Sequence, residues 1–280
     1  MKNPIINRRR FLELFGYSCC SIVLPSCATV PITERKQLTL LPESFINGQA
    51  SQMYENVKKK TKLSEDKNAL LKIKQIGKRI ENAVSWYFNE VDKKDPTSQF
   101  QWDYILIDND KIKNAWCLPG GKIAVYSGIL AITKNDDGLA NVMGHEIAHA
   151  VAKHSIERAS RSLVLNVSTT AADILSGGAI SRAQRTTGVD VTGMLRRFGI
   201  DNPFGRKQEI EADYLGLIFS SIAGYNINES IKIWERMAEL NKGKEPPEWM
   251  STHPSSKKRI ENLKKWIPEI ILDYPPKNLS

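Results

Sequence analysis

The chain has 280 residues, of which 41% are hydrophobic and 25% charged, and its formal net charge is +9. This composition is ordinary for a globular protein with one large or two small domains. The basic residues are scattered and accompany no nucleic-acid-binding motif, so a nucleic-acid partner is not expected. The four cysteines form no C-x-x-C pattern, which argues against a disulfide framework and a cysteine-based structural zinc site.

Residues 1–26 have the features of an export signal. A basic triplet, Arg8-Arg9-Arg10, precedes an apolar run that is too short for a membrane span. Leu24-Pro25-Ser26-Cys27 resembles the lipobox of bacterial lipoproteins, although Pro25 is unusual there, and predicts a lipidated Cys27. The triplet also resembles a twin-arginine signal, and the general secretion route is equally compatible with it. An ordinary buried thiol is the alternative for Cys27.

Segment 27–60 is expected to contain the anchor cysteine, an extended linker from Thr29 to Leu41 and a first helix. Helical patterning covers 43–88 as a whole. Strands are predicted at 102–107 and 122–126, and Asn114-Ala115-Trp116 would extend an edge between them. Because a sheet edge can hold an extended peptide through main-chain hydrogen bonds, Asn114 and Ala115 are candidate substrate-binding residues. A plain hairpin packed on the helices is the alternative.

His145-Glu146-Ile147-Ala148-His149 lies in the segment 139–159, whose apolar residues predict a buried central helix capped by Asp136 or Asp137. Residues four apart share a helix face, so the two histidines can aim their rings at one point. A catalytic zinc ion needs such nitrogen ligands, an open position for water and a carboxylate that takes the proton. The pattern therefore predicts a zinc site with Glu146 as general base; a chance grouping of ordinary side chains is the alternative.

Further helices are predicted at 162–175, 209–221, 228–240 and 256–266. Between them, the segment from Gly177 to Gly205 is poorly patterned. A long segment of this kind is often functional, and we interpret it as a flap over the active site, with disorder as the alternative.

A third zinc ligand is expected on another helix, because catalytic zinc usually has three protein ligands. His154 does not match the extended H-E-x-x-H-x-x-G-x-x-H pattern, and on a continuous helix it would point away from the paired histidines. It is therefore expected at the surface or behind a ligand. The candidates are Glu209, Glu211 and Asp213; Glu209 and Asp213 share a face, while Glu211 points elsewhere. Asp213 could hold a ligand imidazole in one tautomer. A solvated acidic face is the alternative.

Together these motifs resemble the M48 family of zinc metallopeptidases. The matching segments are Val30 to Thr33, Asn114-Ala115 with Pro119-Gly120-Gly121, His145 to His149, Glu209-x-x-Ala212-Asp213, and Thr252-His253-Pro254 with Arg259. One departure is Gly205-Arg206, where the family often has Ser-Arg. The chain lacks the multiple membrane spans of the prenyl-protease branch and the repeat domain of some periplasmic members. It therefore resembles the small single-domain lipoprotein branch.

The resemblance implies an α+β fold, in which a mostly helical zincin-type domain over 61–270 carries a small β-sheet beside the active-site helix, and 271–280 is a tail. It implies one Zn²⁺ per chain, with the ligands His145, His149 and Glu209, the base Glu146 and the supporting carboxylate Asp213. A histidine near the metal is implied at His253, which would contact the zinc, gate it or stabilise an oxyanion. A plain loop histidine is the alternative.

The function that this resemblance implies is a zinc-dependent endopeptidase that cleaves misfolded or unassembled cell-envelope proteins. Lipidated Cys27 would anchor it to the membrane, facing the periplasm, and Ala28 favours the outer membrane. The alternative is an envelope chaperone that retains the zincin fold, with latent or secondary proteolysis. A hydrolase acting on a bond other than a peptide is a weaker third hypothesis.

Overall fold

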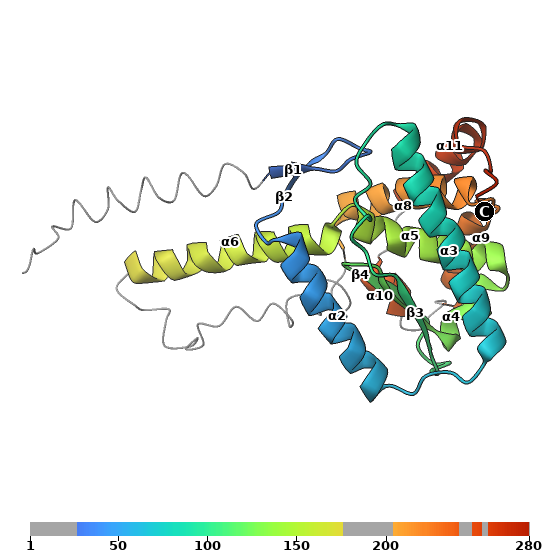
Figure 1. Cartoon of the computed structure of the whole chain (residues 1–280), viewed down its shortest axis with the longest axis horizontal. Helices are drawn as coiled ribbons and strands as arrows, with labels where there is room; N and C mark the ends of the chain where they lie inside the picture. The colour runs from blue at the N-terminus through green and yellow to red at the C-terminus, as the bar shows by residue number, and fades with distance from the viewer. Residues whose placement is uncertain (1–26, 176–203, 241–247, 254–256, 280) are drawn as a thin grey trace, which may run out of the picture.

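The computed structural model describes residues 27–175, 204–240, 248–253 and 257–279. They form a mostly helical α+β domain with two small sheets, which confirms the predicted fold class (Figure 1). Within these ranges, no helix combines the length and the apolar character needed to cross a membrane. The predicted signal segment and nearly all of the predicted flap lie outside the described residues.

The segment predicted as an extended linker is a β-hairpin. β1 (Cys27–Thr29) pairs antiparallel with β2 (Lys36–Leu38). The tight turn between them includes Glu34, whose φ of 54° is left-handed, and it is closed by main-chain bonds between Val30 and Arg35 and between Glu34 and Val30. Val30 is fully buried in the main core, and this apolar contact explains why the hairpin docks on the domain.

Two helices replace the single helical stretch predicted over 43–88. These are α2 (Glu43–Lys60) and α3 (Lys67–Glu90). Asp66 begins α3, because its carboxylate accepts a hydrogen bond of 2.9 Å from the backbone of Ala69. Isoleucines at helical spacing on α3 face the core, as the periodicity predicts.

The larger sheet has three strands in the order β3-β5-β4. β3 (Asp103–Ile107) runs parallel to β5 (Lys122–Tyr126), and β4 (Ala115–Leu118) pairs antiparallel with β5. The turn between β4 and β5 contains Gly120 and Gly121, both left-handed. β4 is thus an edge strand, where the sequence predicts one.

After α4 (Ser127–Thr133) comes the central helix α5 (Asp136–Val151). Its N-cap is Asn135, whose side chain accepts a 2.7 Å hydrogen bond from Gly138. The expectation that Asp136 or Asp137 caps this helix is therefore wrong by one or two positions, since both lie in its first turn.

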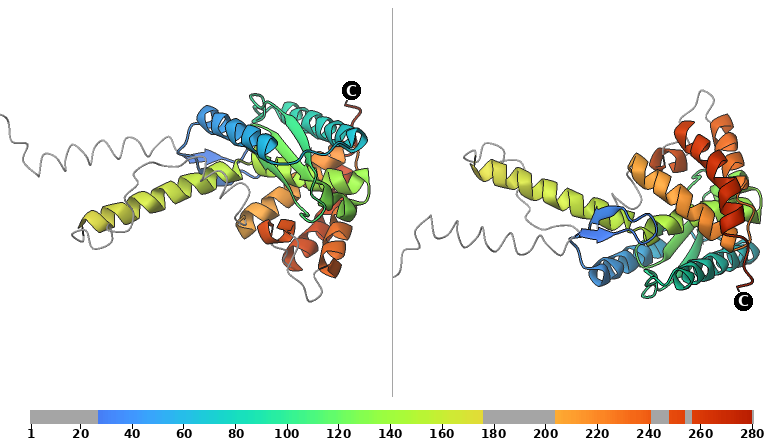
Figure 2. Two further views of the ribbon diagram at one scale, coloured as in Figure 1. Left: turned by 90° about the horizontal axis from the view of Figure 1, so that it is seen from below. Right: turned by 90° about the horizontal axis from the view of Figure 1, so that it is seen from above.

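The helix carrying the paired histidines is shorter than predicted. It ends at Val151 instead of continuing to position 159, because Lys153 adopts a left-handed φ of 56°. A new helix, α6 (His154–Leu175), starts directly after this break and projects from the body of the domain (Figures 1 and 2). The break changes the direction of the His154 side chain, which now points toward His149.

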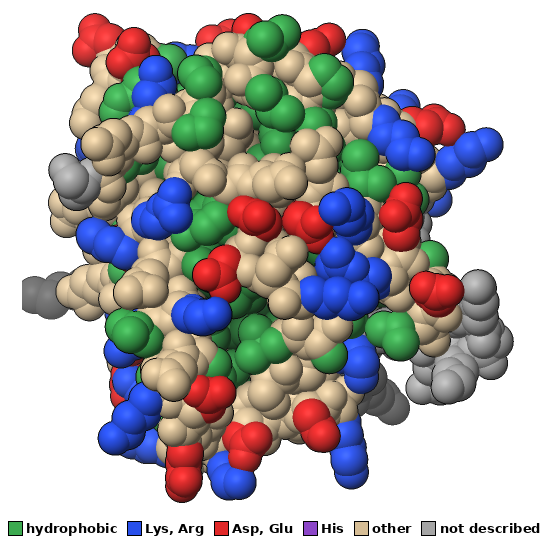
Figure 3. All heavy atoms as spheres, turned by 90° about the vertical axis from the view of Figure 1, so that its right-hand side faces the viewer, with side chains coloured by type: hydrophobic (Ala, Val, Ile, Leu, Met, Phe, Trp, Pro, Cys, Tyr) green, Lys and Arg blue, Asp and Glu red, His purple; other side chains and the backbone are tan. Residues whose placement is uncertain are grey.

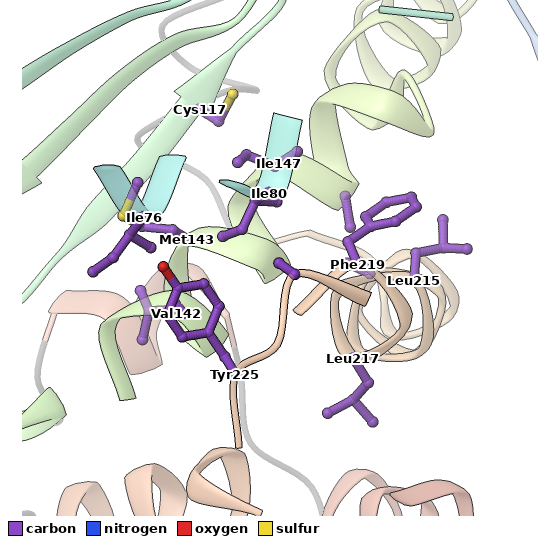
Figure 4. Close-up of a cluster of buried hydrophobic side chains, with 14 of the residues drawn as sticks. Ile76, Ile80, Cys117, Val142, Met143, Ile147, Leu215, Leu217, Phe219 and Tyr225 are labelled. Atoms are coloured by element: carbon purple, nitrogen blue, oxygen red, sulfur yellow. The ribbon is translucent and has the colours of Figure 1, made fainter. Parts of the chain in front are cut away.

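The C-terminal part supplies α8 (Arg206–Ile222), α9 (Glu229–Leu240), α10 (Glu248–Thr252) and α11 (Lys257–Asp273). α5 packs between α3, the sheet and α8, and Figure 4 shows Ile80, Met143 and Phe219 from these helices in one buried cluster. On the face in Figure 3, basic side chains are interspersed with acidic and apolar ones, which agrees with a scattered excess of charge.

Candidate metal centre

Two glycines let α5 and α8 touch where they cross. A Cβ atom on Gly216 would lie 2.8 Å from the backbone nitrogen of His145, and one on Gly144 would lie 3.0 Å from the carbonyl oxygen of Gly216. The 2.8 Å distance is too short for a larger residue at Gly216 without a shift of the backbone, and the 3.0 Å distance at Gly144 would be tight. The close approach places the histidines of α5 opposite the carboxylates of α8.

Four buried side chains converge at this crossing. His145 and His149 come from α5, Glu209 from α8 and His253 from the residue after α10. One nitrogen or oxygen atom from each lies within 4.8 Å of the corresponding atoms of the other three. The exposed fractions of these residues are between 1% and 4%. The structure thus brings together the three predicted ligands and the histidine implied beside them.

The contacts within this group are short. The Nε2 atoms of His145 and His149 are 3.1 Å apart, and Nδ1 of His253 lies 3.2 Å from His145 Nε2. The same Nδ1 atom lies 3.0 Å from Oε1 of Glu209. Three imidazoles that meet through their ring nitrogens cannot all be satisfied by one another, whereas a cation at their centre would accept a lone pair from each.

Asp213 lies behind His145, as predicted. Its Oδ1 atom is 3.1 Å from Nδ1 of His145. A carboxylate accepts hydrogen bonds only, so in the neutral ring this contact favours a proton on Nδ1 and leaves the Nε2 lone pair facing the other ligands. Burial lowers the pKa of His145, but Asp213 and Glu209 outweigh this effect and raise it to about 9. A metal ion must therefore displace a proton from Nε2 at neutral pH.

Arg259, on α11, neutralises the two carboxylates of α8. Its Nε and Nη2 atoms donate to the two oxygens of Asp213 at 2.7 Å, and Nη1 lies 2.7 Å from Oε2 of Glu209. Burial alone would raise the pKa of both acids, yet Arg259 and the neighbouring histidines hold the pKa of each below its usual value. Both acids are consequently ionised and able to support a cation.

Glu146 faces the same centre from the neighbouring position on α5. Its Oε1 atom accepts a 2.8 Å hydrogen bond from the indole nitrogen of Trp249 and lies 3.3 Å from Nε2 of His253. Glu146 is 2% exposed, so these contacts replace water at its carboxylate. The general base proposed from the sequence is therefore held by the segment that carries His253.

Aromatic rings cover the centre. Phe204 stacks on the ring of His149 with centroids 3.9 Å apart, and its backbone nitrogen donates to Thr252. Trp249 closes a second side, since its ring packs on His145 and His253. A cavity of about 20 Å³ behind His145, lined in part by Asp213 and Trp234, has room for one water molecule. Among the described residues, these rings leave the converging side chains almost fully buried.

The edge strand begins close to the cover. Asn114 and Ala115 are buried, and the Asn114 side chain accepts a hydrogen bond from the Ala115 backbone. The carbonyl of the preceding residue, Lys113, accepts from the backbone of Trp249 at 3.0 Å. Ala115 thus begins the edge strand and Asn114 directly precedes it, and main-chain groups at this end are already hydrogen-bonded.

His154 lies behind a ligand and is fully buried, so the expectation of a surface position is wrong and the expectation of a position behind a ligand fits. Its Nδ1 atom is 2.8 Å from Nδ1 of His149. The left-handed Lys153 makes this contact possible, because on an unbroken helix His154 would point away. Glu211 does point away from the centre, as expected, but its Oε2 atom lies 2.9 Å from Nε2 of His154.

Several residues of the site carry no recognisable signal in the sequence. Trp249 and Phe204 are isolated aromatic residues in segments without a pattern, and their position depends on tertiary packing. Arg259 appears among the motif residues, but nothing local assigns its partners. For His154, its closeness in sequence to the paired histidines was a signal of a role in the site. Its placement could not be predicted, because the sequence does not reveal the helix break at Lys153.

Comparisons with known proteins agree with this geometry. Residues 74–267 match the sequence profile of Peptidase family M48. The chain is 30% identical over 276 residues to the mitochondrial metalloendopeptidase OMA1 of Saccharomyces cerevisiae, an alignment that covers 93% of this chain and 75% of that protein. It is 29% identical to the mitochondrial metalloendopeptidase OMA1 of Homo sapiens, covering 93% of this chain and 49% of that protein. The beta-barrel assembly-enhancing protease of Escherichia coli O157:H7 is 28% identical over 58% of this chain and 33% of its own length.

Proposed function

Because this chain belongs to peptidase family M48, we propose that it is a zinc endopeptidase in which His145, His149 and Glu209 hold the metal and Glu146 is the general base. The observation that carries the proposal is the convergence of these buried side chains, with the His145 lone pair directed inward by Asp213. Burial also holds the pKa of His149 well below its usual value, so this ring is neutral as a metal ligand must be.

The chemistry follows from the positions of the residues. Zinc bound by this set supplies Lewis-acid polarisation of the scissile carbonyl and lowers the pKa of a water molecule. Glu146 takes the proton of the attacking water and later delivers it to the leaving amine nitrogen. Asp213 and Arg259 keep the supporting charges fixed while this proton moves.

His253 acts as a gate in this proposal. It lies within contact distance of His145 and Glu209, in the space that a fourth ligand would take. Catalytic zinc sites keep such a position open for water and substrate. The proteolytic state therefore requires His253 and α10 to move away, and the state described here is the resting one.

The direct test is cleavage of casein by purified protein, with zinc quantified on the same sample, for the wild type and Glu146→Gln. We expect both proteins to carry one zinc per chain. The variant should lose activity by about 10²–10⁴-fold, the usual contribution of a general base. A fully active variant would contradict the assigned base, and a wild type without zinc would contradict the metal site.

The substrates and location that we propose come from the sequence and from one relative. The lipobox-like residues before Cys27 support a lipid anchor facing the periplasm, with Ala28 favouring the outer membrane. The E. coli relative is named for enhancing β-barrel assembly, which supports misfolded or unassembled envelope proteins as substrates. Intact mass of the protein from a Gram-negative host tests the anchor: Cys27→Ser should remove the lipid mass, and an unlipidated wild type would refute it.

The closed cover favours a second candidate, an envelope chaperone with secondary proteolysis. Glu146 and the four converging side chains are nearly inaccessible, so the resting protein could bind clients without cleaving them. Complementation of a deletion strain by Glu146→Gln separates the two functions. Full complementation would favour the chaperone, and loss of complementation the protease.

A further inference from the structure

The proposed ligand His149 is the inner end of a line of side chains that reaches the N-terminal hairpin. From His149 the line continues to His154 at 2.8 Å and from there to Glu211 at 2.9 Å. The outer oxygen contacts of Glu211 come from the hairpin: Arg35 Nε donates to Oε2 at 2.8 Å, and the Thr33 hydroxyl donates to Oε1. The hairpin thus holds a carboxylate that lies more than 170 positions further along the chain.

The donor and acceptor roles at each contact determine which ring nitrogen of each histidine carries the proton. Glu211 accepts from His154 Nε2, because the ionised carboxylate has no proton to donate. The proton of neutral His154 is then on Nε2, and its Nδ1 atom is an acceptor. His149 must therefore donate from Nδ1, and its own lone pair lies on Nε2, the atom that faces His145. This is the tautomer that a metal ligand in this place needs.

Arg35 holds the outer end in place with both edges of its guanidinium. Besides its bond to Glu211, it donates from Nη1 and Nη2 to the two oxygens of Glu157 at 3.0 Å and 2.9 Å. The Glu157 side chain is fully buried, and Gln208 also donates to it at 3.0 Å. A planar guanidinium can bridge two carboxylates in this way, which a lysine cannot do with the same geometry.

The hairpin is anchored independently of this arginine. Val30 is buried in the main core, and the backbone of Leu40, just after β2, donates to the hydroxyl of Ser160 on α6 at 3.0 Å. These contacts place Arg35 against α6 and α8 at once.

We propose that the hairpin formed by residues 27–38 supports the metal centre by holding Glu211. In this proposal Arg35 is a positioning residue that orients His149 through Glu211 and His154. The inference rests on the proposed ligand set. It assigns a role to three residues that bind neither metal nor substrate. Partners of metal ligands typically contribute 10–100-fold to metal affinity.

The test measures zinc affinity of the full chain by competition with a chromophoric chelator. Arg35→Met is compared with Arg161→Met. Arg161 is the matched control, because it donates to the same Glu157 at 2.6 Å while its side chain is 63% exposed, and Glu211 is held by Arg35 instead. We expect about tenfold weaker zinc binding for Arg35→Met and an unchanged value for Arg161→Met.

A second readout separates orientation from general stability. The visible absorption bands of the Co²⁺-substituted protein report ligand geometry and should shift in Arg35→Met and in His154→Leu, while Arg161→Met keeps the wild-type spectrum. Wild-type affinity and spectrum in Arg35→Met would overturn the inference, as would equal losses in the two arginine variants. A wild type that binds no metal would instead refute the proposed function, so the two failures are distinguishable.

Discussion

The indole Nε1 of Trp249 donates a 2.8 Å hydrogen bond to Oε1 of Glu146, and so joins the cover of the site to the proposed general base. The backbone nitrogen of Trp249 also donates to the carbonyl of Lys113, two residues before the edge strand. Trp249 therefore forms hydrogen bonds with two groups at once: the Glu146 carboxylate and the Lys113 carbonyl, close to where an extended peptide would begin to pair with the strand. Opening of the site must break both bonds.

Loss of the indole hydrogen bond should favour the open state. In Trp249→Phe the ring packing is largely kept, while the bond to the buried carboxylate is removed. Hydrogen bonds to charged groups contribute about 1.5–3 kcal/mol. We expect at least a tenfold rise in casein cleavage with unchanged zinc content, measured in initial rates. A decrease in rate would instead give Trp249 a role in catalysis.

Removal of the His253 imidazole should also activate the enzyme. His253→Ala leaves three protein ligands and vacates the fourth position, so we expect retained zinc and a several-fold higher peptidase rate. Zinc content and cleavage are measured on one preparation. If the rate falls, His253 acts on the reacting atoms; if rate and Co²⁺ spectrum are both unchanged, the gate hypothesis is abandoned.

Arg259→Met should strongly destabilise the metal-free protein. The change leaves Asp213 and Glu209 buried without their cation, a situation that typically costs about 3–5 kcal/mol. Urea unfolding in the presence of a chelator measures the loss. Arg259→Lys keeps the positive charge but not the bidentate hydrogen bonds to Asp213. Its free energy of unfolding should therefore lie between those of Arg259→Met and the wild type.

Gly216→Ala should separate α8 from α5. The new methyl group would collide with the backbone of His145, so Glu209 and the histidines would move apart. We expect weaker zinc binding together with reduced thermal stability. Gly48→Ala is the matched control: it lies inside α2 with no atom within 4 Å of the added Cβ, and should stabilise by about 0.5–1 kcal/mol. Equal behaviour of the two variants would contradict the close-contact argument.

Stability should fall in acid partly through Glu157. Burial alone would raise its pKa, but Arg35, Gln208 and Arg161 outweigh it, so the pKa lies below the ordinary value of 4.5. The stabilisation is fully present above pH 4.5 and is lost as the pH falls through the lowered value. Metal-free Glu157→Gln should be less stable than the wild type by about 1.5–3 kcal/mol at pH 7. Urea unfolding from pH 7 to pH 3 should show this difference shrinking; a constant difference would refute the linkage.

The sequence predicts the parts of the site that depend on local helix geometry. His145 and His149 are four residues apart on one helix, as are Glu209 and Asp213, and each pair faces the centre as this spacing requires. Periodicity likewise located most of the helices and strands, while the fold class followed from the family resemblance. These features need no knowledge of how distant segments pack.

The remaining parts depend on backbone conformation and long-range contacts. A left-handed Lys153 is uncommon for a residue with a side chain, so the sequence indicates one continuous helix and places His154 on the wrong side. The extended linker was wrong for a similar reason, because a short polar segment with one buried valine shows little strand pattern. The partners of Arg35 lie 122 and 176 positions away, and no local pattern predicts them.

Because Arg35 precedes its partners by 122 and 176 positions, the contacts form in a fixed order during synthesis. Its partners Glu157 and Glu211 are made long after it, so Arg35 must wait for most of the polypeptide before it can dock. The catalytic helix can form earlier, yet the orienting contacts behind His149 cannot. A nascent chain thus contains the H-E-x-x-H motif before the contacts behind His149 can form, and under the proposed role of Arg35 its centre binds zinc at full strength only after the hairpin has docked.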